Sequence, residues 1–300
     1  MSGWVFVRLI WDTNWQLAIE HRRLRELGNL SFLRKFTGLA IVTASTFAPR
    51  FMARILVRRI LTPRRSRSHL SQTHERVDIG NGIVGWQESG QDPKMPLALF
   101  VHGFDGDHDQ WRAFGKVVHQ AGYRVVFLDP PGHGTSKAGQ CDPIVFSDAV
   151  GSAFEILGPI SLYLGHSMGA AAGVMATSDS INANAYVLIA SPVIMARTIE
   201  ATALRIGLGR AATDALQDEI GRKVGVHPRN IDLVPSVSGQ SVPALIIHDR
   251  NDRQVPFSEA ETLSAAWPDA QLFATGGLGH NRILQDEKVL REVAGFLERL

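Results

Sequence analysis

Short apolar runs recur along the chain beyond residue 71, and most are separated by stretches with an apolar residue every three or four positions. The runs predict strands, in the order ERVDIG, IVGWQES, PLALFVHG, YRVVFLD, ISLYLGH, AYVLIASP, PALIIHD and AQLFATGG. The first two are expected to form a hairpin, because the Asn81-Gly82 pair between them suits a tight turn. Most of the remaining runs are nearly continuous in apolar residues, which is typical of parallel strands covered on both faces.

The stretches between the strands predict helices, namely WRAFGKVVHQAG, FSDAVGSAFEILG, AAAGVMATS, FSEAETLSAAW and the closing DEKVLREVAGFLERL. Alternation of strands and helices favours a doubly wound, mostly parallel α/β sheet. The fold class predicted for residues 71–300 is therefore α/β.

The first 70 residues show a different, basic amphipathic pattern, with arginines every four residues opposite apolar positions (Arg50, Arg54 and Arg58 against Met52, Ile55 and Leu56). They carry 13 Lys and Arg residues against three acidic ones, whereas residues 71–300 carry 18 against 26. We therefore predict a basic helical N-terminal arm at residues 1–70 and a separate domain at 71–300. Because the larger part is acidic, no nucleic-acid partner is expected.

Three roles are open for the arm: packing on the body or another subunit, peripheral contact with a membrane surface and, as the weakest of the three, a mitochondrial presequence. Its longest uncharged run, FTGLAIVTASTFAP, has 14 residues, fewer than the roughly 20 that a spanning helix needs. That run begins after residue 35, too late for a signal peptide. The predicted location is cytoplasmic, with the inner membrane surface as the site of any peripheral contact.

Composition argues against several kinds of site. Cys141 is the only cysteine, so internal disulfides and thiolate zinc clusters are excluded. No glycine-rich phosphate loop of the G-x-x-x-x-G-K type occurs. The acidic group Asp105, Asp107, His108 and Asp109 lacks the spacing of a calcium loop, and it is interpreted as a solvated loop of the active site. No metal or cofactor is predicted.

The stretch LGHSMGAA places Ser167 between Gly165 and Gly169, at the junction of a predicted strand and a predicted helix. Such a turn strains the central residue, and small residues two places away let the strand and helix approach. The serine is then raised above the carboxyl edge of the sheet, which is a typical position for a nucleophile.

A nucleophilic serine needs a base and an orienting carboxylate. Asp252 follows the predicted strand PALIIHD, and His280 lies in the loop after the next strand. Asp249 is the alternative acid on the same loop. Either acid could orient the imidazole.

Four motifs, GHSMG, HGFDGDHDQW, DPPGHGTS and HDRNDRQVP, give residues 74–300 a resemblance to the α/β-hydrolase fold superfamily, in particular to esterases and monoacylglycerol-lipase-like members. The resemblance implies that the amides of Phe104 and Met168 form an oxyanion hole. The spacing in that family before Val255-Pro256 also favours Asp252 over Asp249 as the acid. The residues beside these motifs, His102, Gly103 and His166, are candidates for lining the substrate pocket. Families on this fold with an aspartate nucleophile are disfavoured by Ser167.

The insertion at residues 194–242 predicts a short lid of two helices, ARTIEATALRIGL and RAATDALQDEIGRKVG. Its apolar positions would suit an acyl chain or simple packing on the body. The predicted function is a serine hydrolase that cleaves a carboxylic ester with an apolar acyl group through an acyl-enzyme, without a cofactor. The alternatives are a thioesterase, a carbon-carbon bond hydrolase, an acyltransferase or a non-catalytic ligand-binding protein.

Overall fold

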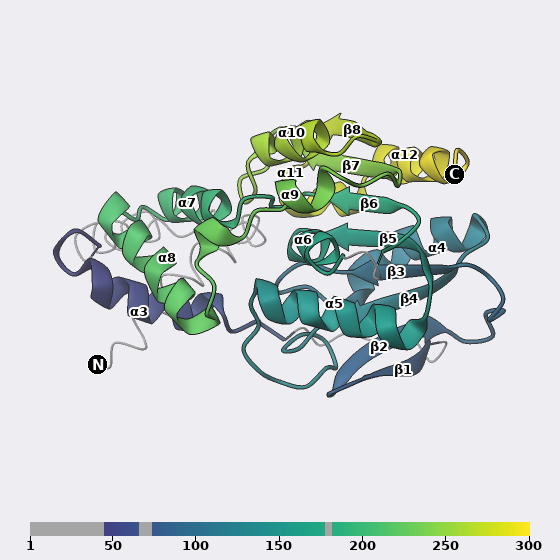
Figure 1. The fold of residues 1–300 in the computed structure, drawn as a ribbon, viewed down its shortest axis with the longest axis horizontal. Helices are drawn as coiled ribbons and strands as arrows, with labels where there is room; N and C mark the ends of the chain where they lie inside the picture. Colours follow the sequence, from purple (N-terminus) through teal and green to yellow (C-terminus); the bar gives the residue numbers. More distant parts are fainter. Residues whose placement is uncertain (1–44, 66–73, 178–181) are drawn as a thin grey trace, which may run out of the picture. The chain divides into compact units, whose positions relative to one another are not determined.

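The structure is a computed structural model that describes residues 45–65, 74–177 and 182–300 (Figure 1). The chain divides into two compact units. The larger unit comprises Ile60–Thr198 and Pro228–Leu300, and the described part of the smaller one comprises residues 45–59 and Ile199–His227. Each unit is described by itself below.

The larger unit is built on one eight-stranded sheet with the order β1-β2-β4-β3-β5-β6-β7-β8. The strands are β1 (His74–Gly80), β2 (Ile83–Glu88), β3 (Leu97–Val101), β4 (Arg124–Asp129), β5 (Ile160–His166), β6 (Tyr186–Ile189), β7 (Ala244–Asp249) and β8 (Ala270–Thr275). The pairs β1·β2 and β2·β4 are antiparallel, and every other pair is parallel. The doubly wound α/β fold is confirmed.

The predicted hairpin joins β1 to β2 through Asn81 and Gly82, both of which have a positive φ (53° and 78°). Asparagine and glycine tolerate that conformation better than other residues do. This local chemistry is why the turn could be located in the sequence.

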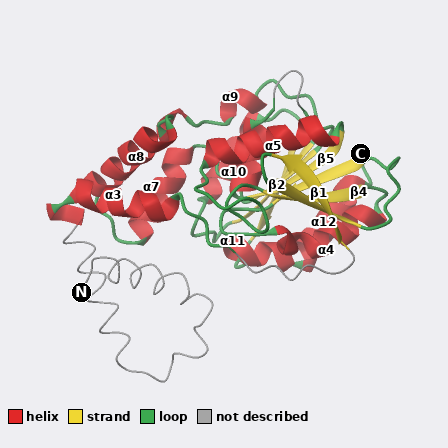
Figure 2. Ribbon diagram, turned by 90° about the horizontal axis from the view of Figure 1, so that it is seen from below, coloured by secondary structure: helices red, strands yellow, loops and turns green. Residues whose placement is uncertain are grey.

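Helices cover both faces of the sheet (Figure 2). One face carries α4 (Arg112–Gln120) and α12 (Glu287–Leu297), and the other carries α5 (Pro143–Leu157), α6 (Met168–Met175), α9 (Val234–Val237) and α10 (Phe257–Ala266). Strand β3 shows why its sequence is continuously apolar: Leu97, Leu99 and Val101 enter one core cluster while Ala98 and Phe100 enter the other. Successive side chains of a strand point to opposite faces, and here both faces are buried.

The loops at the carboxyl ends of the strands contain short helices, namely η1 (His108–Trp111), α11 (Gly279–Arg282) and η3 (Ile283–Gln285). A further 3-10 turn, η2 (Pro228–Asn230), precedes α9. The stem of the predicted lid is paired within this unit, because Ile194 bridges Asp232 and the N–H of Leu233 donates to Val193 O at 3.1 Å.

The smaller unit contains α3 (Pro49–Ile60), the part of α7 (Met195–Arg205) from Ile199 onward, and α8 (Arg210–Val224). Helix α3 buries its apolar side, formed by Met52, Ala53, Leu56 and Val57. The two helices predicted for the lid are present as α7 and α8, while their action as a lid stays a prediction.

The predicted boundary at residue 70 falls outside the described residues, as does most of the arm. Among the helices that the structure describes, none is long and apolar enough to cross a membrane.

Candidate active site

Ser167 stands at a sharp turn between β5 and α6 with φ 53° and ψ −120°, an unusual conformation for a residue other than glycine. A side chain at Gly165 would overlap the backbone of Ala170, and one at Gly169 would overlap the carbonyl of Val101. Both glycines are thus required for the strand and the helix to approach, as the spacing in the sequence predicts. The N–H of Ser167 donates to Ile189 O at 2.8 Å, which anchors the turn to β6.

The structure brings Ser167, His280 and Asp252 together. Nε2 of His280 lies 2.9 Å from Oγ of Ser167, and Nδ1 of His280 lies 2.7 Å from Oδ2 of Asp252. The carboxylate is inaccessible to solvent, and the imidazole is nearly so, with side-chain exposures of 0% and 8%. An ionised carboxylate can only accept, so Nδ1–H is the donor and Nε2 is left to accept from the serine hydroxyl.

The acid is held by its own loop. Oδ1 of Asp252 accepts the N–H groups of Gln254 at 2.7 Å and Val255 at 3.1 Å, and its Oδ2 also lies 3.6 Å from Nε2 of His248. Burial alone would raise the pKa of Asp252. The hydrogen bonds from His280 and from the backbone N–H of Gln254 nevertheless hold that pKa below its usual value. The group is therefore an anion at neutral pH.

Asp249, the alternative acid, makes different contacts. It accepts hydrogen bonds from Thr275 Oγ1 at 2.8 Å, Leu278 N at 3.0 Å and Asn251 N at 2.9 Å. These bonds hold the loop that carries His280, whereas the imidazole itself is bonded to Asp252. The structure places Asp252 beside the imidazole and Asp249 against the loop that follows β8, while the role of Asp252 as the catalytic acid stays a prediction.

The turn after β3 lies directly against Ser167. A Cβ at Gly103 would be 2.9 Å from Cβ of Ser167 and 3.0 Å from Nδ1 of His166. The N–H of Gly106 closes this turn on Gly103 O at 3.0 Å, with Phe104 inside it. Met168 is the first residue of α6, where backbone N–H groups have no partner within the helix. Both residues predicted for the oxyanion hole thus belong to segments that adjoin Ser167.

His102 and His166 are both buried, with 0% and 3% of their surface exposed. Nδ1 of His102 lies 2.7 Å from Gly103 O, and Nε2 of His166 lies 3.0 Å from His280 O. Burial, together with the nearby His280, lowers the pKa of His166 to about 3, so this ring is neutral at pH 7. Both rings thus contact backbone carbonyl groups, and their role in lining a substrate pocket stays a prediction.

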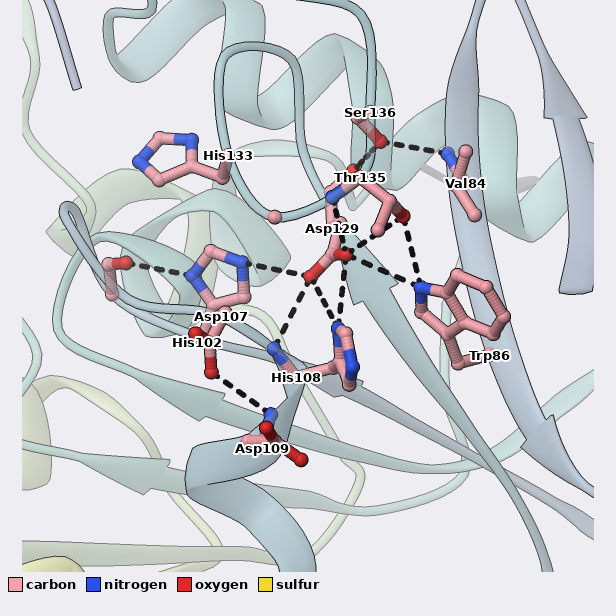
Figure 3. A network of polar contacts seen from close by, with 12 residues as sticks. Val84, Trp86, His102, Asp107, His108, Asp109, Asp129, His133, Thr135 and Ser136 are labelled. Carbon is pink, nitrogen blue, oxygen red and sulfur yellow. Dashed lines mark hydrogen bonds and ion pairs between the residues drawn. The ribbon is translucent and has the colours of Figure 1, made fainter. Parts of the chain in front are cut away.

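A buried polar network behind the turn was not predicted from the sequence (Figure 3). Its centre is Asp129, at the end of β4, with His102, His108, Trp86 and Thr135 around it. The interpretation of His108 as part of a solvated loop is wrong, because this residue is only 5% exposed. The motif DPPGHGTS contains Asp129 and Thr135, but the sequence did not show which residues they would contact. Among the described residues, no group of His, Cys, Asp and Glu has the arrangement of a metal site.

A sequence model of the family described as alpha/beta hydrolase fold matches residues 96–205. The chain has the α/β-hydrolase fold. A structure of an esterase from Pyrococcus furiosus agrees with it at a TM-score of 0.61 and 19% sequence identity, over 79% of this chain and 98% of that one. A bromoperoxidase from Bacillus anthracis gives 0.56 at 17% identity, over 76% and 100% of the two chains. At such low identities the likeness shows the fold alone.

The curated relatives match a shorter segment. The 2-succinyl-6-hydroxy-2,4-cyclohexadiene-1-carboxylate synthase of Escherichia coli is 32% identical over 93 residues, which is 30% of this chain and 35% of that protein. The match thus spans about a third of the length of these relatives.

Proposed function

We propose that the protein is a serine hydrolase that cleaves a carboxylic ester through an acyl-enzyme. The observation that carries this proposal is the continuous chain of hydrogen bonds from Ser167 Oγ through His280 to Asp252, with 2.9 and 2.7 Å between the bonded atoms. A serine hydroxyl is a weak nucleophile unless a positioned base removes its proton, and this arrangement supplies the base and its orienting acid.

In the proposed reaction, Oγ of Ser167 attacks the ester carbonyl as Nε2 of His280 takes its proton. The oxygen that becomes negative accepts hydrogen bonds from the N–H groups of Phe104 and Met168, each worth roughly 3 kcal/mol in the transition state. The imidazolium then protonates the departing alcohol. Water, deprotonated by His280, releases the acid from the serine. Asp252 stays ionised and stabilises the imidazolium throughout. This route uses no cofactor.

The proposed acyl group is apolar, as the apolar positions of segment 194–206 suggest. A thioesterase, a carbon-carbon bond hydrolase and an acyltransferase could use the same serine and base, and they are the alternatives. Because these relatives are named as synthases of a cyclohexadiene carboxylate, that class of compound is a further test substrate beside esters and thioesters.

The test is labelling with a fluorophosphonate probe, followed by turnover of p-nitrophenyl esters of increasing chain length. Ser167→Ala should abolish labelling and reduce turnover to background. Its melting temperature should stay close to that of the wild type, because a hydroxyl at this turn contributes little packing. Ser152→Ala, on the outer part of α5, is the matched control and should change neither signal. Turnover by Ser167→Ala near the wild-type rate would refute the proposed nucleophile.

We also propose that α3 contacts an anionic lipid surface. Its sequence contains four arginines and no acidic residue. Arg50 and Arg54 are exposed beside Phe51, which is 64% exposed, and Phe47, which precedes the helix, is 84% exposed. Because the apolar side of α3 is buried, contact would use this mixed arginine and phenylalanine side, where each basic residue near the surface contributes about 1 kcal/mol.

Cosedimentation of the full chain with phosphatidylserine vesicles, at low and high salt, tests this surface. The double variant Arg50→Gln/Arg54→Gln should bind several-fold more weakly at low salt, and Phe47→Ser/Phe51→Ser should weaken binding at both salt concentrations. Arg291→Gln, an exposed arginine on α12, is the control. Equal pelleting of all four proteins would exclude α3 as the contact.

A further inference from the structure

The peptide group between Gly103 and Phe104 is held by its carbonyl oxygen. Gly103 O accepts the N–H of Gly106 at 3.0 Å and a hydrogen bond from Nδ1 of the His102 ring at 2.7 Å. A carbonyl oxygen only accepts, so Nδ1 carries the hydrogen in this contact. Because a trans peptide is planar, its C=O and N–H point in opposite directions. The two donors on Gly103 O therefore fix the direction of the Phe104 N–H.

The His102 ring is itself fixed in the interior. It is fully buried, and its Nε2 lies 3.5 Å from Oδ1 of Asp129 (Figure 3). Its ring lies 5.2 Å from that of His133 and 6.2 Å from that of Phe146, measured between centroids. Rotation of the imidazole away from Gly103 would break these contacts, so the donor is held in place.

Asp129 is an unusually well-bonded carboxylate. It accepts hydrogen bonds from the backbone N–H of His108 at 3.1 Å, the His108 ring at 2.9 Å, and the N–H of Thr135 at 3.1 Å. Burial alone would raise the pKa of Asp129, but the nearby His102 ring and the hydrogen bonds from His108 hold it well below its usual range. Asp129 is thus a fixed anion that joins the end of β4 to the turn after β3.

The turn has a second support from the segment after β4. The N–H of Asp105, which follows Phe104, donates to Nε2 of His133 at 3.2 Å. Nδ1 of His133 donates to Pro131 O at 3.0 Å, so Nε2 is free to accept. Asp105 has φ 62°, a conformation that persists only where surrounding contacts impose it. The far end of the turn is therefore also held by a hydrogen bond.

We propose that His102 is a positioning residue for the oxyanion hole: by donating to Gly103 O it aims and polarises the Phe104 N–H toward the oxygen that becomes negative above Ser167. Hydrogen bonds to the carbonyl of a peptide strengthen its N–H as a donor. Asp129 lies beside the ring that makes this bond, 3.5 Å from its Nε2. The inference rests on the proposed acyl-enzyme reaction, in which Phe104 is an oxyanion donor.

A loosened Phe104 N–H would stabilise the transition state less while leaving ground-state binding of the ester nearly unchanged. Loss of one oxyanion donor costs about 10²–10³-fold in kcat. His102→Phe keeps an aromatic ring but removes the donor, and because it disorients the amide rather than deleting it, we expect kcat to fall by about 10–100-fold with KM within about twofold. The inhibition constant of phenylboronic acid, whose serine adduct carries a tetrahedral anion, should rise by a similar factor.

Two further variants distinguish the contribution of Nδ1 from that of Nε2. In His102→Asn the amide NH₂ takes the place of Nδ1 and can still donate to Gly103 O. In His102→Gln the NH₂ takes the place of Nε2, beside Asp129, and the contact with Gly103 is lost. The asparagine variant should retain several-fold more kcat than the glutamine variant at equal melting temperature. This comparison decides the inference even where the phenylalanine variant does not fold.

His119→Phe is the matched control, because Nδ1 of His119 also bonds a backbone carbonyl, Tyr123 O at 3.0 Å, on the remote α4. It should lower stability slightly and leave kcat and the boronate affinity unchanged. A wild type without ester turnover or probe labelling would remove the proposed function itself. An active wild type would overturn the role of His102 alone if the folded Asn and Gln variants had equal kcat, or if kcat and boronate affinity of folded His102→Phe stayed within twofold of wild type.

Discussion

Replacing Asp252 by asparagine exchanges one carboxylate oxygen for an NH₂ group, and the neighbours of Asp252 determine which one. Oδ1 accepts two backbone N–H groups, from Gln254 at 2.7 Å and Val255 at 3.1 Å, whereas Oδ2 faces Nδ1 of His280 at 2.7 Å. The single oxygen of the amide is expected to stay with the two backbone donors, because an NH₂ group placed there would leave both unpaired. The NH₂ group then faces the imidazole.

An NH₂ group beside Nδ1 of His280 favours the tautomer that carries its hydrogen on Nε2. That nitrogen lies 2.9 Å from Oγ of Ser167 and, once protonated, cannot take the serine proton. The same substitution in the serine protease triad lowers kcat by about 10⁴-fold, and we expect a loss of that order here. It corresponds to about 5 kcal/mol of transition-state stabilisation.

The assay is kcat and kcat/KM for a p-nitrophenyl ester, with melting temperatures measured in parallel. Asp249→Asn is the matched control, since Asp249 is a buried aspartate at the end of β7, three residues before Asp252, that bonds Thr275, Leu278 and Asn251. It should lose about 1–3 kcal/mol of stability because two N–H donors face an amide with one oxygen, and it should keep activity within about tenfold. A loss of activity larger for Asp249→Asn than for Asp252→Asn would transfer the role to Asp249.

Two further substitutions test the buried network. Gly134→Ala should destabilise the protein by at least about 2 kcal/mol in urea unfolding, because φ is 42° and a Cβ would overlap the carboxylate of Asp129; Gly139→Ala, with nothing within 4 Å, should be nearly neutral. Burial lowers the pKa of His108, but the bond to Asp129 outweighs it and the net pKa is raised. That contribution to stability is complete below the unfolded value of about 6.5 and is lost as pH rises through the folded value. The melting-temperature difference between wild type and His108→Asn should therefore be larger at pH 6 than at pH 9, and a difference that grows with pH would contradict this assignment.

The strands and the turn at Ser167 could be predicted because their signals are local. Each residue of β3 is buried, with alternate side chains in two clusters, so the run is apolar at every position. A side chain at Gly165 would overlap the backbone of Ala170, and one at Gly169 would overlap that of Val101 on the adjoining strand. The spacing of the two glycines around Ser167 is visible in the sequence. Local patterns of this kind need no knowledge of distant partners.

The network around Asp129 could not be predicted because its members come from four separate segments. Trp86 lies on β2, His102 and His108 follow β3, Asp129 ends β4, and Thr135 lies in the next loop. No periodicity connects these positions. The acidic neighbours of His108 in the sequence suggested a solvated loop, but its N–H and ring face a buried carboxylate, and that tertiary contact decides its exposure.

Sheet topology explains why two aspartate-histidine pairs, Asp252 with His280 and Asp129 with His102, lie near Ser167. Asp129 ends β4 and Asp252 follows β7, on opposite sides of β5, which carries Ser167 at its own carboxyl end. Parallel strands bring all three ends to one edge of the sheet. A histidine from one side therefore reaches the hydroxyl of Ser167, while a histidine from the other reaches the peptide that precedes Phe104. In the proposed reaction the first pair moves a proton and the second only holds an amide, so a substitution at His280 removes the base, whereas one at His102 lowers kcat and leaves the base in place.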